Sequence, residues 1–242
     1  MKLYRFLIVC IISLSCTNSD DVEGDSTLEN YIMNKTVNNG AVIACAASDT
    51  ETNDVLVFYY PETGASNIRL YETIDAEVDG NMFSNYDRIE INPLPLFNGY
   101  LEKVVRSLQN EKRIIVTFEL NGEINVSNPI HVKQTSKPSV WSNDVSINQE
   151  TAQMPKFVWE NNAFNDNAIY FQVISDAQDN LLSGTYTYEN QFQYYNITNV
   201  VLNITTQIPP SLLIGSSYNF TLMDVSEDNW VNTIVQKTFV VQ

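Results

Sequence analysis

Histidine, basic side chains and reactive-site motifs are scarce in this 242-residue sequence, and each shortage excludes a class of chemistry. His131 is the only histidine, so no catalytic or metal site can contain two. The sequence also lacks a Cys-x-x-Cys pair, a Gly-x-Ser-x-Gly turn and a glycine-rich phosphate loop. Its 29 Asp and Glu outnumber 13 Lys and Arg, and the net charge of −16 makes nucleic acid, another polyanion, a poor partner.

Long apolar runs are missing after the first residues of the chain, where residues 6–15 are too few to span a membrane. Lys2 and Arg5 precede this run and small Ser15 ends it, which gives the three parts of a secretory signal peptide. The cysteine that follows, Cys16, resembles the lipobox cysteine of bacterial lipoproteins, whose thiol takes a diacylglyceryl group and becomes the new N-terminus. We therefore expect a signal peptide over residues 1–15 and a lipid anchor on Cys16. The alternative is a secreted protein with an incidental cysteine.

The segment after Cys16 is acidic and contains no aromatic or basic residue as far as Asn30. Such a segment cannot offset the entropy cost of ordering, so residues 16–30 are predicted to form a disordered tether. An acidic patch directly after the lipidated cysteine resembles the export signal of surface lipoproteins in Bacteroidota. That resemblance implies an anchor in the outer membrane facing the medium, with a periplasm-facing anchor as the alternative. The triplet "DST" resembles the O-glycosylation motif of the same bacteria and makes Ser26 a candidate for modification.

Cysteine is also too scarce for a disulfide framework once the leader is removed. Cys10 belongs to the leader and Cys16 is the expected anchor, which leaves Cys45 alone in the small-residue run "AVIACAAS". Cys45 is therefore interpreted as a buried space-filling residue rather than a nucleophile. Stability must then come from core burial, and the length of the chain suits two domains of about 100 residues each.

The hydrophobic pattern is that of β-strands, most clearly in "RIIVTFELNGEINV". Alternate side chains of its first strand form one apolar face, with a second set opposite: Ile114, Val116, Phe118 and Leu120 against Ile115, Thr117 and Glu119. Asn121 and Gly122 tolerate the positive φ of a two-residue type I′ turn, so this stretch is predicted to be a hairpin. Continuing the register places His131 on the outer face beside Lys133, where a solvated side chain is favoured over a metal ligand or general base.

Other short strands follow the same pattern, separated by turn residues, and predict an all-β protein built from β-sandwiches. Residues 98–109 are the exception, because their apolar side chains fit either a short helix or an irregular strand. Polar residues around Pro138 predict a boundary. The domains are expected at residues 31–136 and 137–242.

The second domain resembles a fibronectin type III domain in three features of residues 141–242. Trp159 lies in an early strand, Leu212 precedes Tyr218 by six residues before an alternating strand, and a closing hairpin runs through the polar loop "DVSEDNW". The resemblance implies that Tyr218 forms the tyrosine corner and that Trp159 packs in the core. The first domain resembles immunoglobulin-like or type III domains less specifically, through its Asn-Gly hairpin.

Aromatic side chains are the best candidates for ligand contact, because flat rings on a rigid scaffold bind sugars or partner side chains at small entropic cost. Trp230 ends the polar loop "SEDNW", Trp141 opens the second domain, and Tyr194 and Tyr195 point to opposite faces of one strand. Burial in the fold is the alternative for each. The acidic clusters in predicted loops match no calcium-binding loop, so solvated turns are favoured and no metal or cofactor is expected.

Together these features predict a non-catalytic cell-envelope lipoprotein that serves as a surface-tethered binding or spacer module. Its partners would be the membrane, through the lipid on Cys16, and an unidentified protein or glycan. A carbohydrate-binding accessory lipoprotein of a polysaccharide-uptake system, in the manner of starch-utilisation lipoproteins, is the alternative. A hydrolase that uses carboxylates is less favoured, because no acidic pair has a flanking signature that would separate two pKa values.

Overall fold

A computed structural model describes residues 26–205 and 207–242 of the chain. Cys16 and the first part of the expected tether lie outside these residues. The predicted all-β class is confirmed: the described residues form four β-sheets, one short α-helix and two short 3-10 segments, Phe83–Asn85 and Phe97–Gly99. No helix among them has the length and apolar character needed to cross a membrane.

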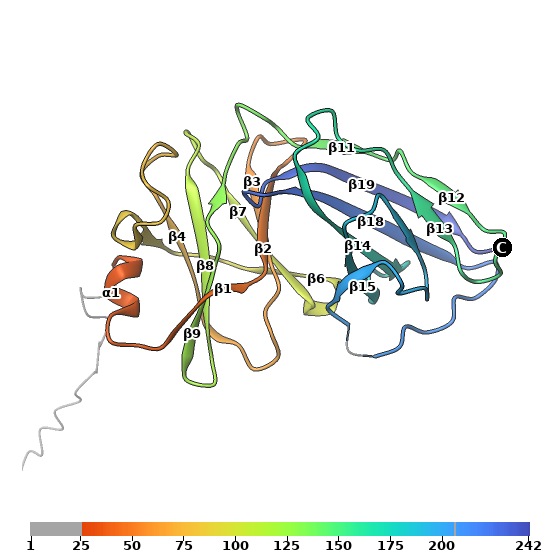
Figure 1. The fold of residues 1–242 in the computed structure, drawn as a ribbon, viewed down its shortest axis with the longest axis horizontal. Helices are drawn as coiled ribbons and strands as arrows, with labels where there is room; N and C mark the ends of the chain where they lie inside the picture. Colours follow the sequence, from red (N-terminus) through yellow and green to blue (C-terminus); the bar gives the residue numbers. More distant parts are fainter. Residues whose placement is uncertain (1–25, 206) are drawn as a thin grey trace, which may run out of the picture.

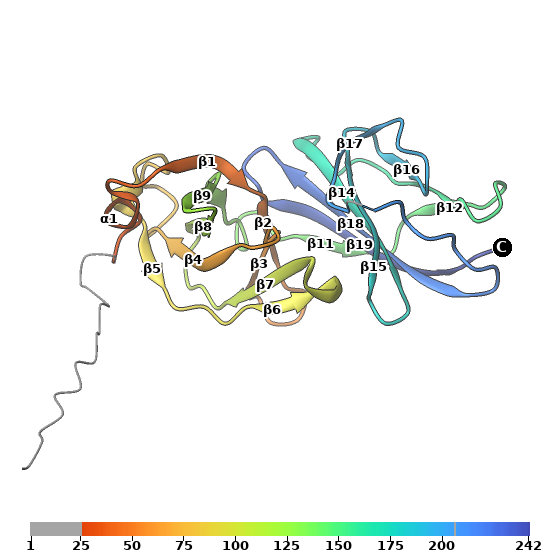
Figure 2. The same cartoon turned by 90° about the horizontal axis from the view of Figure 1, so that it is seen from below.

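The four sheets and α1 (Leu28–Ile32) follow one another along the long axis of the molecule (Figures 1 and 2). Sheet I contains β1 (Val37–Val42), β9 (Glu123–Ser127), β8 (Arg113–Leu120), β4 (Ser66–Glu72) and β5 (Asp87–Ile89), with β10 (Ile130–His131) also on β8. Sheet II contains β2 (Ala44–Ser48), β3 (Val55–Tyr59), β7 (Leu101–Arg106) and β6 (Leu94–Leu96).

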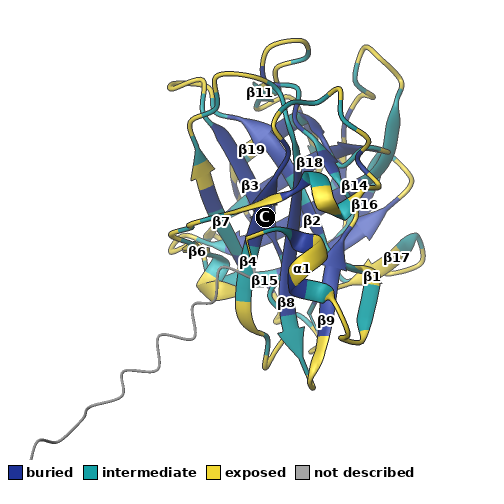
Figure 3. Cartoon of the chain, turned by 90° about the vertical axis from the view of Figure 1, so that its left-hand side faces the viewer, coloured by how far each residue is buried: buried dark blue, intermediate teal, exposed yellow. Residues whose placement is uncertain are grey.

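Sheets III and IV are formed by the strands after Pro138. Sheet III contains β11 (Val140–Ser142), β19 (Val231–Val240), β18 (Ser217–Ser226), β14 (Asn167–Asp176), β15 (Leu181–Thr187) and β17 (Val200–Asn203). Sheet IV contains β12 (Ser146–Asn148), β13 (Lys156–Val158) and β16 (Gln191–Gln193). Seen from the α1 end, strands through the middle of the molecule are largely buried and the connecting loops are exposed (Figure 3).

The predicted hairpin is present as β8 and β9, with positive φ at Asn121 (55°) and Gly122 (83°). Its expected core face is correct, because Ile114, Val116 and Phe118 are buried between sheets I and II. The opposite face is also buried, since Ile115 packs beneath α1 in a second cluster. Sheet I is therefore covered on both sides in this region.

Helix α1 corrects the prediction for the last residues of the tether. Thr27 caps the helix, and Leu28 and Tyr31 are fully buried against sheet I. The Leu28 N–H donates to the Tyr86 carbonyl over 2.9 Å, and the Arg88 N–H donates to the Ser26 carbonyl over 2.7 Å. Composition suggested disorder through residue 30, but one leucine and one tyrosine suffice to anchor a single helical turn where a sheet face is available.

The sandwich of sheets III and IV has an aromatic core. Phe157 stacks on Phe220 with ring centroids 4.2 Å apart, and Trp159 packs edge-on against Tyr170. The Tyr218 hydroxyl accepts a hydrogen bond from the Leu213 N–H over 3.0 Å, which is the kind of bond that a tyrosine corner makes. The structure thus places Trp159 and Tyr218 in the core roles that the resemblance implied.

A fourth apolar cluster joins the two sandwiches through the outer faces of sheets II and III. Leu56 and Phe58 of β3 contact it from one side, and Met223 and Ile234 from the other. Strand β3 is consequently buried on both faces. The ambiguous residues 98–109 contain β7, a strand of sheet II that contributes Leu101 to this cluster.

Candidate functional site at the junction of the sandwiches

The tip of the β18–β19 hairpin crosses the junction and enters the other sandwich. Trp230 is fully buried in the core between sheets I and II, among residues of β2, β3 and β8. Its indole N–H donates to the Lys137 carbonyl over 2.8 Å. The Ala46 N–H donates to the Asn229 carbonyl over 3.1 Å, and the His131 N–H donates to the Asp228 carbonyl over 3.0 Å. The hairpin tip therefore bonds to both sheets of the N-terminal sandwich.

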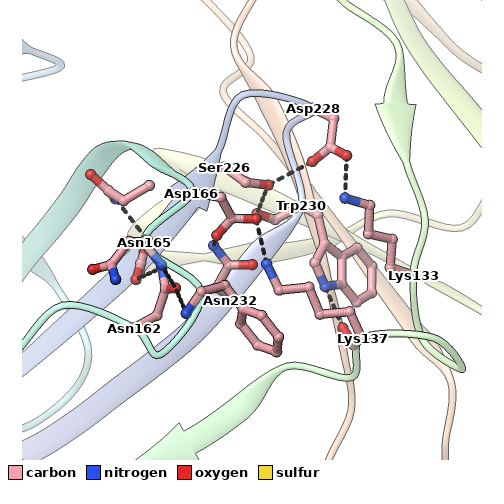
Figure 4. Close-up of polar contacts among 12 residues, drawn as sticks. Lys133, Lys137, Asn162, Asn165, Asp166, Ser226, Asp228, Trp230 and Asn232 are labelled. Atoms are coloured by element: carbon pink, nitrogen blue, oxygen red, sulfur yellow. Dashed lines mark hydrogen bonds and ion pairs between the residues drawn. The ribbon is translucent and has the colours of Figure 1, made fainter.

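Charged side chains surround this insertion (Figure 4). Asp228 forms an ion pair with Lys133, and its other carboxylate oxygen accepts from the Ser226 hydroxyl over 2.6 Å. Lys137 pairs with Asp166, which also accepts from the Asn232 amide over 3.0 Å. These contacts join the hairpin, the segment after β10 and the β13–β14 loop.

Two groups in this region have shifted pKa values. Burial acts to raise the pKa of Asp228, but the hydrogen bonds from Lys133 and Ser226 outweigh it, so the pKa is lowered. Burial lowers the pKa of His131, and the positive charge of Arg113 adds to this effect, while Asp228 opposes it. The His131 Nδ1 lies 3.7 Å from the Asp228 carboxylate. His131 is thus a half-buried junction residue, and the prediction of a freely solvated side chain was wrong.

A cleft of about 390 Å³ lies beside the apolar cluster that joins sheets II and III. Its first wall carries Phe58, Leu96, Phe97 and Lys103, and its second carries Thr221, Met223, Ile234, Gln236 and Thr238. Trp141 also lines the cleft, and its indole N–H donates to the Ser48 carbonyl over 2.8 Å. Asp179 and Asn219 line the cleft as well, and the Asn219 amide donates to the Asp179 carboxylate over 3.1 Å.

The predicted contact residues separate into two groups. Trp230 and Tyr194 were wrong as exposed ligand contacts: both are fully buried, and the Tyr194 hydroxyl donates to the Pro210 carbonyl over 2.7 Å. Each ring instead completes a core, Trp230 in the neighbouring sandwich and Tyr194 in its own. Trp141 and Tyr195 are only partly buried. Of these two, Trp141 lies in the junction cleft, whereas Tyr195 lines a separate hollow near β17.

The remaining candidates do not converge on one place. Ser26 is exposed beside α1, and a Cβ at the turn residue Gly122 would meet nothing within 4 Å. Burial raises the pKa of the Cys45 thiol to about 12, in keeping with an unreactive side chain. Within residues 26–205 and 207–242, no three His, Cys, Asp or Glu side chains are arranged to hold a metal ion.

The cleft residues Phe58, Phe97, Lys103 and Gln236 were missed by sequence reasoning. The available signal was the run "DVLVFYY", which lacks the polar alternation of a sheet with one solvated face. A strand buried on both faces implies a second packing partner. The sequence does not show which strands pack on the second face of β3, because these strands lie more than 150 residues further along the chain.

No family model matches the sequence, and no curated protein matches it either. The glycoside hydrolase domain of Endo-D from Streptococcus pneumoniae aligns with 82% of this chain and 33% of its own length, with a TM-score of 0.33 and 9% identity. A β-glucuronidase from Ruminococcus gnavus aligns with 81% of this chain and 36% of its own length, with a TM-score of 0.29 and 12% identity.

A third structure contains fibronectin(III)-like modules of CbhA from Clostridium thermocellum, and aligns with 86% of this chain and 90% of its own length, with a TM-score of 0.23 and 9% identity. This chain spans about a third of the length of the first two structures. All three TM-scores are low, so these likenesses assign no activity to the chain. The residues of the junction are therefore the basis for assigning a function.

Proposed function

We propose that this chain is a non-catalytic, surface-tethered binding module, in which two locked sandwiches present a preformed cleft and a tether joins them to a membrane anchor on Cys16. The observation that carries this proposal is the insertion of Trp230 into the core of the other sandwich. Together with the shared apolar cluster between sheets II and III, it holds the cleft walls in one arrangement. A preformed site of this kind binds without a large ordering cost.

The ends of the molecule support a tethered arrangement. Helix α1, which follows the expected tether, lies at one end of the long axis, and the C-terminus lies at the other (Figure 1). A lipid on Cys16 would make the α1 end the end of the molecule that is attached to the outer membrane. We favour an anchored protein that faces the medium at the cell surface. A protein that faces the periplasm would use the same lipid anchor on Cys16.

The acidic side chains favour binding over hydrolysis. A glycosidase general acid needs a raised pKa. Four described carboxyl groups have shifted pKa values, and all four pKa values are lowered. Burial acts to raise each pKa, but the hydrogen bonds that the carboxylate accepts outweigh burial. These groups are Glu111, Glu119, Asp176 and Asp228. His131 is occupied at the junction with Asp228.

A carbohydrate-binding accessory role is the second candidate, and the cleft favours it. Its first wall is aromatic and its second wall carries hydroxyl and amide groups, which suits the apolar faces and hydroxyl edges of sugar rings. A purely protein-binding role would be supported instead by a surface partner that is captured equally well when the cleft is altered.

Membrane fractionation of cells that produce the full-length chain tests the anchor. The parent is expected in the outer-membrane fraction, and Cys16→Ser is expected in the soluble envelope fraction. Cys45→Ser is the matched control, because it removes the other cysteine of the mature chain and should leave the location unchanged. Retention of Cys16→Ser in the membrane would remove the anchor from the proposal, and turnover of a polysaccharide by the purified protein would overturn the non-catalytic assignment.

A further inference from the structure

The two walls of the cleft differ in chemistry because strand pairing places particular residues side by side. In sheet II, Phe58 of β3 pairs with Lys103 of β7, so an aromatic ring and an ammonium group share one face. In sheet III, Thr221 of β18 pairs with Gln236 of β19, so a hydroxyl and an amide share the opposing face. All four residues line the same cleft.

Lys103 is the cation available to a ligand in this cleft. Lys112, Lys133 and Lys137 are held in ion pairs elsewhere, and Lys237, which also lines the cleft, donates to the Val145 carbonyl over 2.9 Å. Lys103 forms no ion pair with any residue that the structure describes, although 29 acidic residues occur in the chain. The carboxylate of Asp179, which also lines the cleft, accepts a hydrogen bond from the Asn219 amide.

The aromatic side chains of the cleft supply a stacking surface next to this cation. Phe97 and Trp141 are only partly buried and line the cleft together with the buried Phe58. The volume of about 390 Å³ falls within the range of about 300–1,000 Å³ that is typical of small-ligand sites. The cleft therefore combines an apolar platform, the Lys103 ammonium, which has no hydrogen-bond or ion-pair partner among the described residues, and neutral hydrogen-bonding groups on the opposite wall.

We infer that this cleft binds a glycan that carries a carboxylate, with the sugar ring on Phe97 and Trp141, the carboxylate on Lys103, and ring hydroxyls on Gln236 and Thr221. This inference deepens the proposed binding function and rests on it. The ammonium is the group that selects acidic over neutral sugars, because a charge-assisted hydrogen bond is stronger than a neutral one.

Titration of the full-length protein, purified in detergent, with trigalacturonate tests the inference. Tryptophan fluorescence reports the site directly, because Trp141 lines the cleft while Trp159 and Trp230 are buried in the cores. Trigalacturonate is expected to bind saturably and to change the fluorescence, and Trp141→Phe is expected to abolish the change. The methyl-esterified trisaccharide, which keeps the rings but loses the charges, is expected to bind roughly tenfold or more weakly.

Two variants and one control locate the binding. Lys103→Gln is expected to weaken trigalacturonate roughly tenfold or more and to leave the methyl ester unchanged. Phe97→Ala is expected to weaken both ligands. Lys156→Gln is the matched control, since Lys156 is also a half-buried lysine on a strand but lies outside the cleft and should have no effect.

The outcomes separate this inference from the proposed function. Equal binding of the acid and the ester, with loss in Phe97→Ala, overturns the role of the carboxylate and supports a neutral-glycan module. The cleft is not a glycan site if neither Lys103→Gln nor Phe97→Ala changes the affinity, or if neither trisaccharide binds. The protein would then be a spacer or a protein-binding module. Cleavage of the trisaccharide overturns the non-catalytic function itself.

Discussion

The indole N–H of Trp230 donates to the backbone carbonyl of Lys137 over 2.8 Å, and this bond joins the C-terminal hairpin to the segment that follows β10. The ring is fully buried among residues of the N-terminal sandwich. The last hairpin of the chain therefore completes the first core, and the two sandwiches pack directly against each other.

Replacement of Trp230 by alanine is expected to lower the free energy of unfolding by about 3–5 kcal/mol, the range for removal of a large buried aromatic ring. Urea denaturation at neutral pH measures the effect. Trp230→Phe keeps much of the ring and removes the hydrogen bond to Lys137, so a smaller loss is expected. A change below about 1 kcal/mol in Trp230→Ala would show that the insertion does not stabilise the N-terminal sandwich.

The stability of the protein is expected to fall on mild acidification because of His131. Burial, helped by Arg113 and Lys133 and opposed by Asp228 and Glu111, lowers the pKa of His131 in the folded protein. The unfolded chain, with a histidine pKa of about 6.5, therefore binds the proton more readily. The contribution of neutral His131 to the free energy of unfolding is fully present above the unfolded-state pKa. This contribution is lost as the pH falls through the lower folded-state pKa.

Urea denaturation between roughly pH 7.5 and 5 tests this dependence in the window where an unperturbed histidine titrates. His131→Gln should flatten the decline, because glutamine does not take up the proton. Parallel curves for the parent and the variant over this range would mean that other groups cause the decline.

The sequence predicted those features that short-range alternation determines. The β8–β9 hairpin follows from strict alternation around Asn121 and Gly122, whose positive φ angles the turn requires. The same alternation gave the core face with Ile114, Val116 and Phe118. These residues are specified by neighbours within a few positions, so one local pattern contains the whole signal.

The junction could not be predicted in this way, because its contacts join residues far apart in the chain. The local sequence "SEDNW" predicts that Trp230 is an exposed residue at the tip of a loop. It contains no sign that Trp230 pairs with Ala46 of β2, the edge strand of sheet II. The cleft depends on contacts of the same kind, since Phe58 and Gln236 line one cleft only because sheets II and III pack together. Lys103, in the ambiguous residues 98–109, became a candidate only once β7 was known to be a strand.

Helix α1 gives a second stability test, at the end of the molecule next to the tether. Leu28→Ala is expected to lower the free energy of unfolding by about 2–4 kcal/mol, because Leu28 is fully buried against sheet I. Glu29→Ala is the matched control, since Glu29 is an exposed neighbour in the same turn. If both variants matched the parent in thermal unfolding, residues 28–30 would belong to a disordered tether after all.

The hydroxyl of Tyr218 gives a third test, in the C-terminal sandwich. It accepts a hydrogen bond from the Leu213 N–H over 3.0 Å, and the ring lies in the core. Tyr218→Phe is expected to cost about 1–2 kcal/mol of stability, because it keeps the ring and leaves the N–H without this acceptor. Tyr188→Phe removes a hydroxyl from a side chain that is 67% exposed and should be neutral. Equal denaturation midpoints for the two variants would show that the bond does not stabilise the turn before β18, and a loss confined to Tyr218→Phe would establish it as a fixed corner of this sandwich.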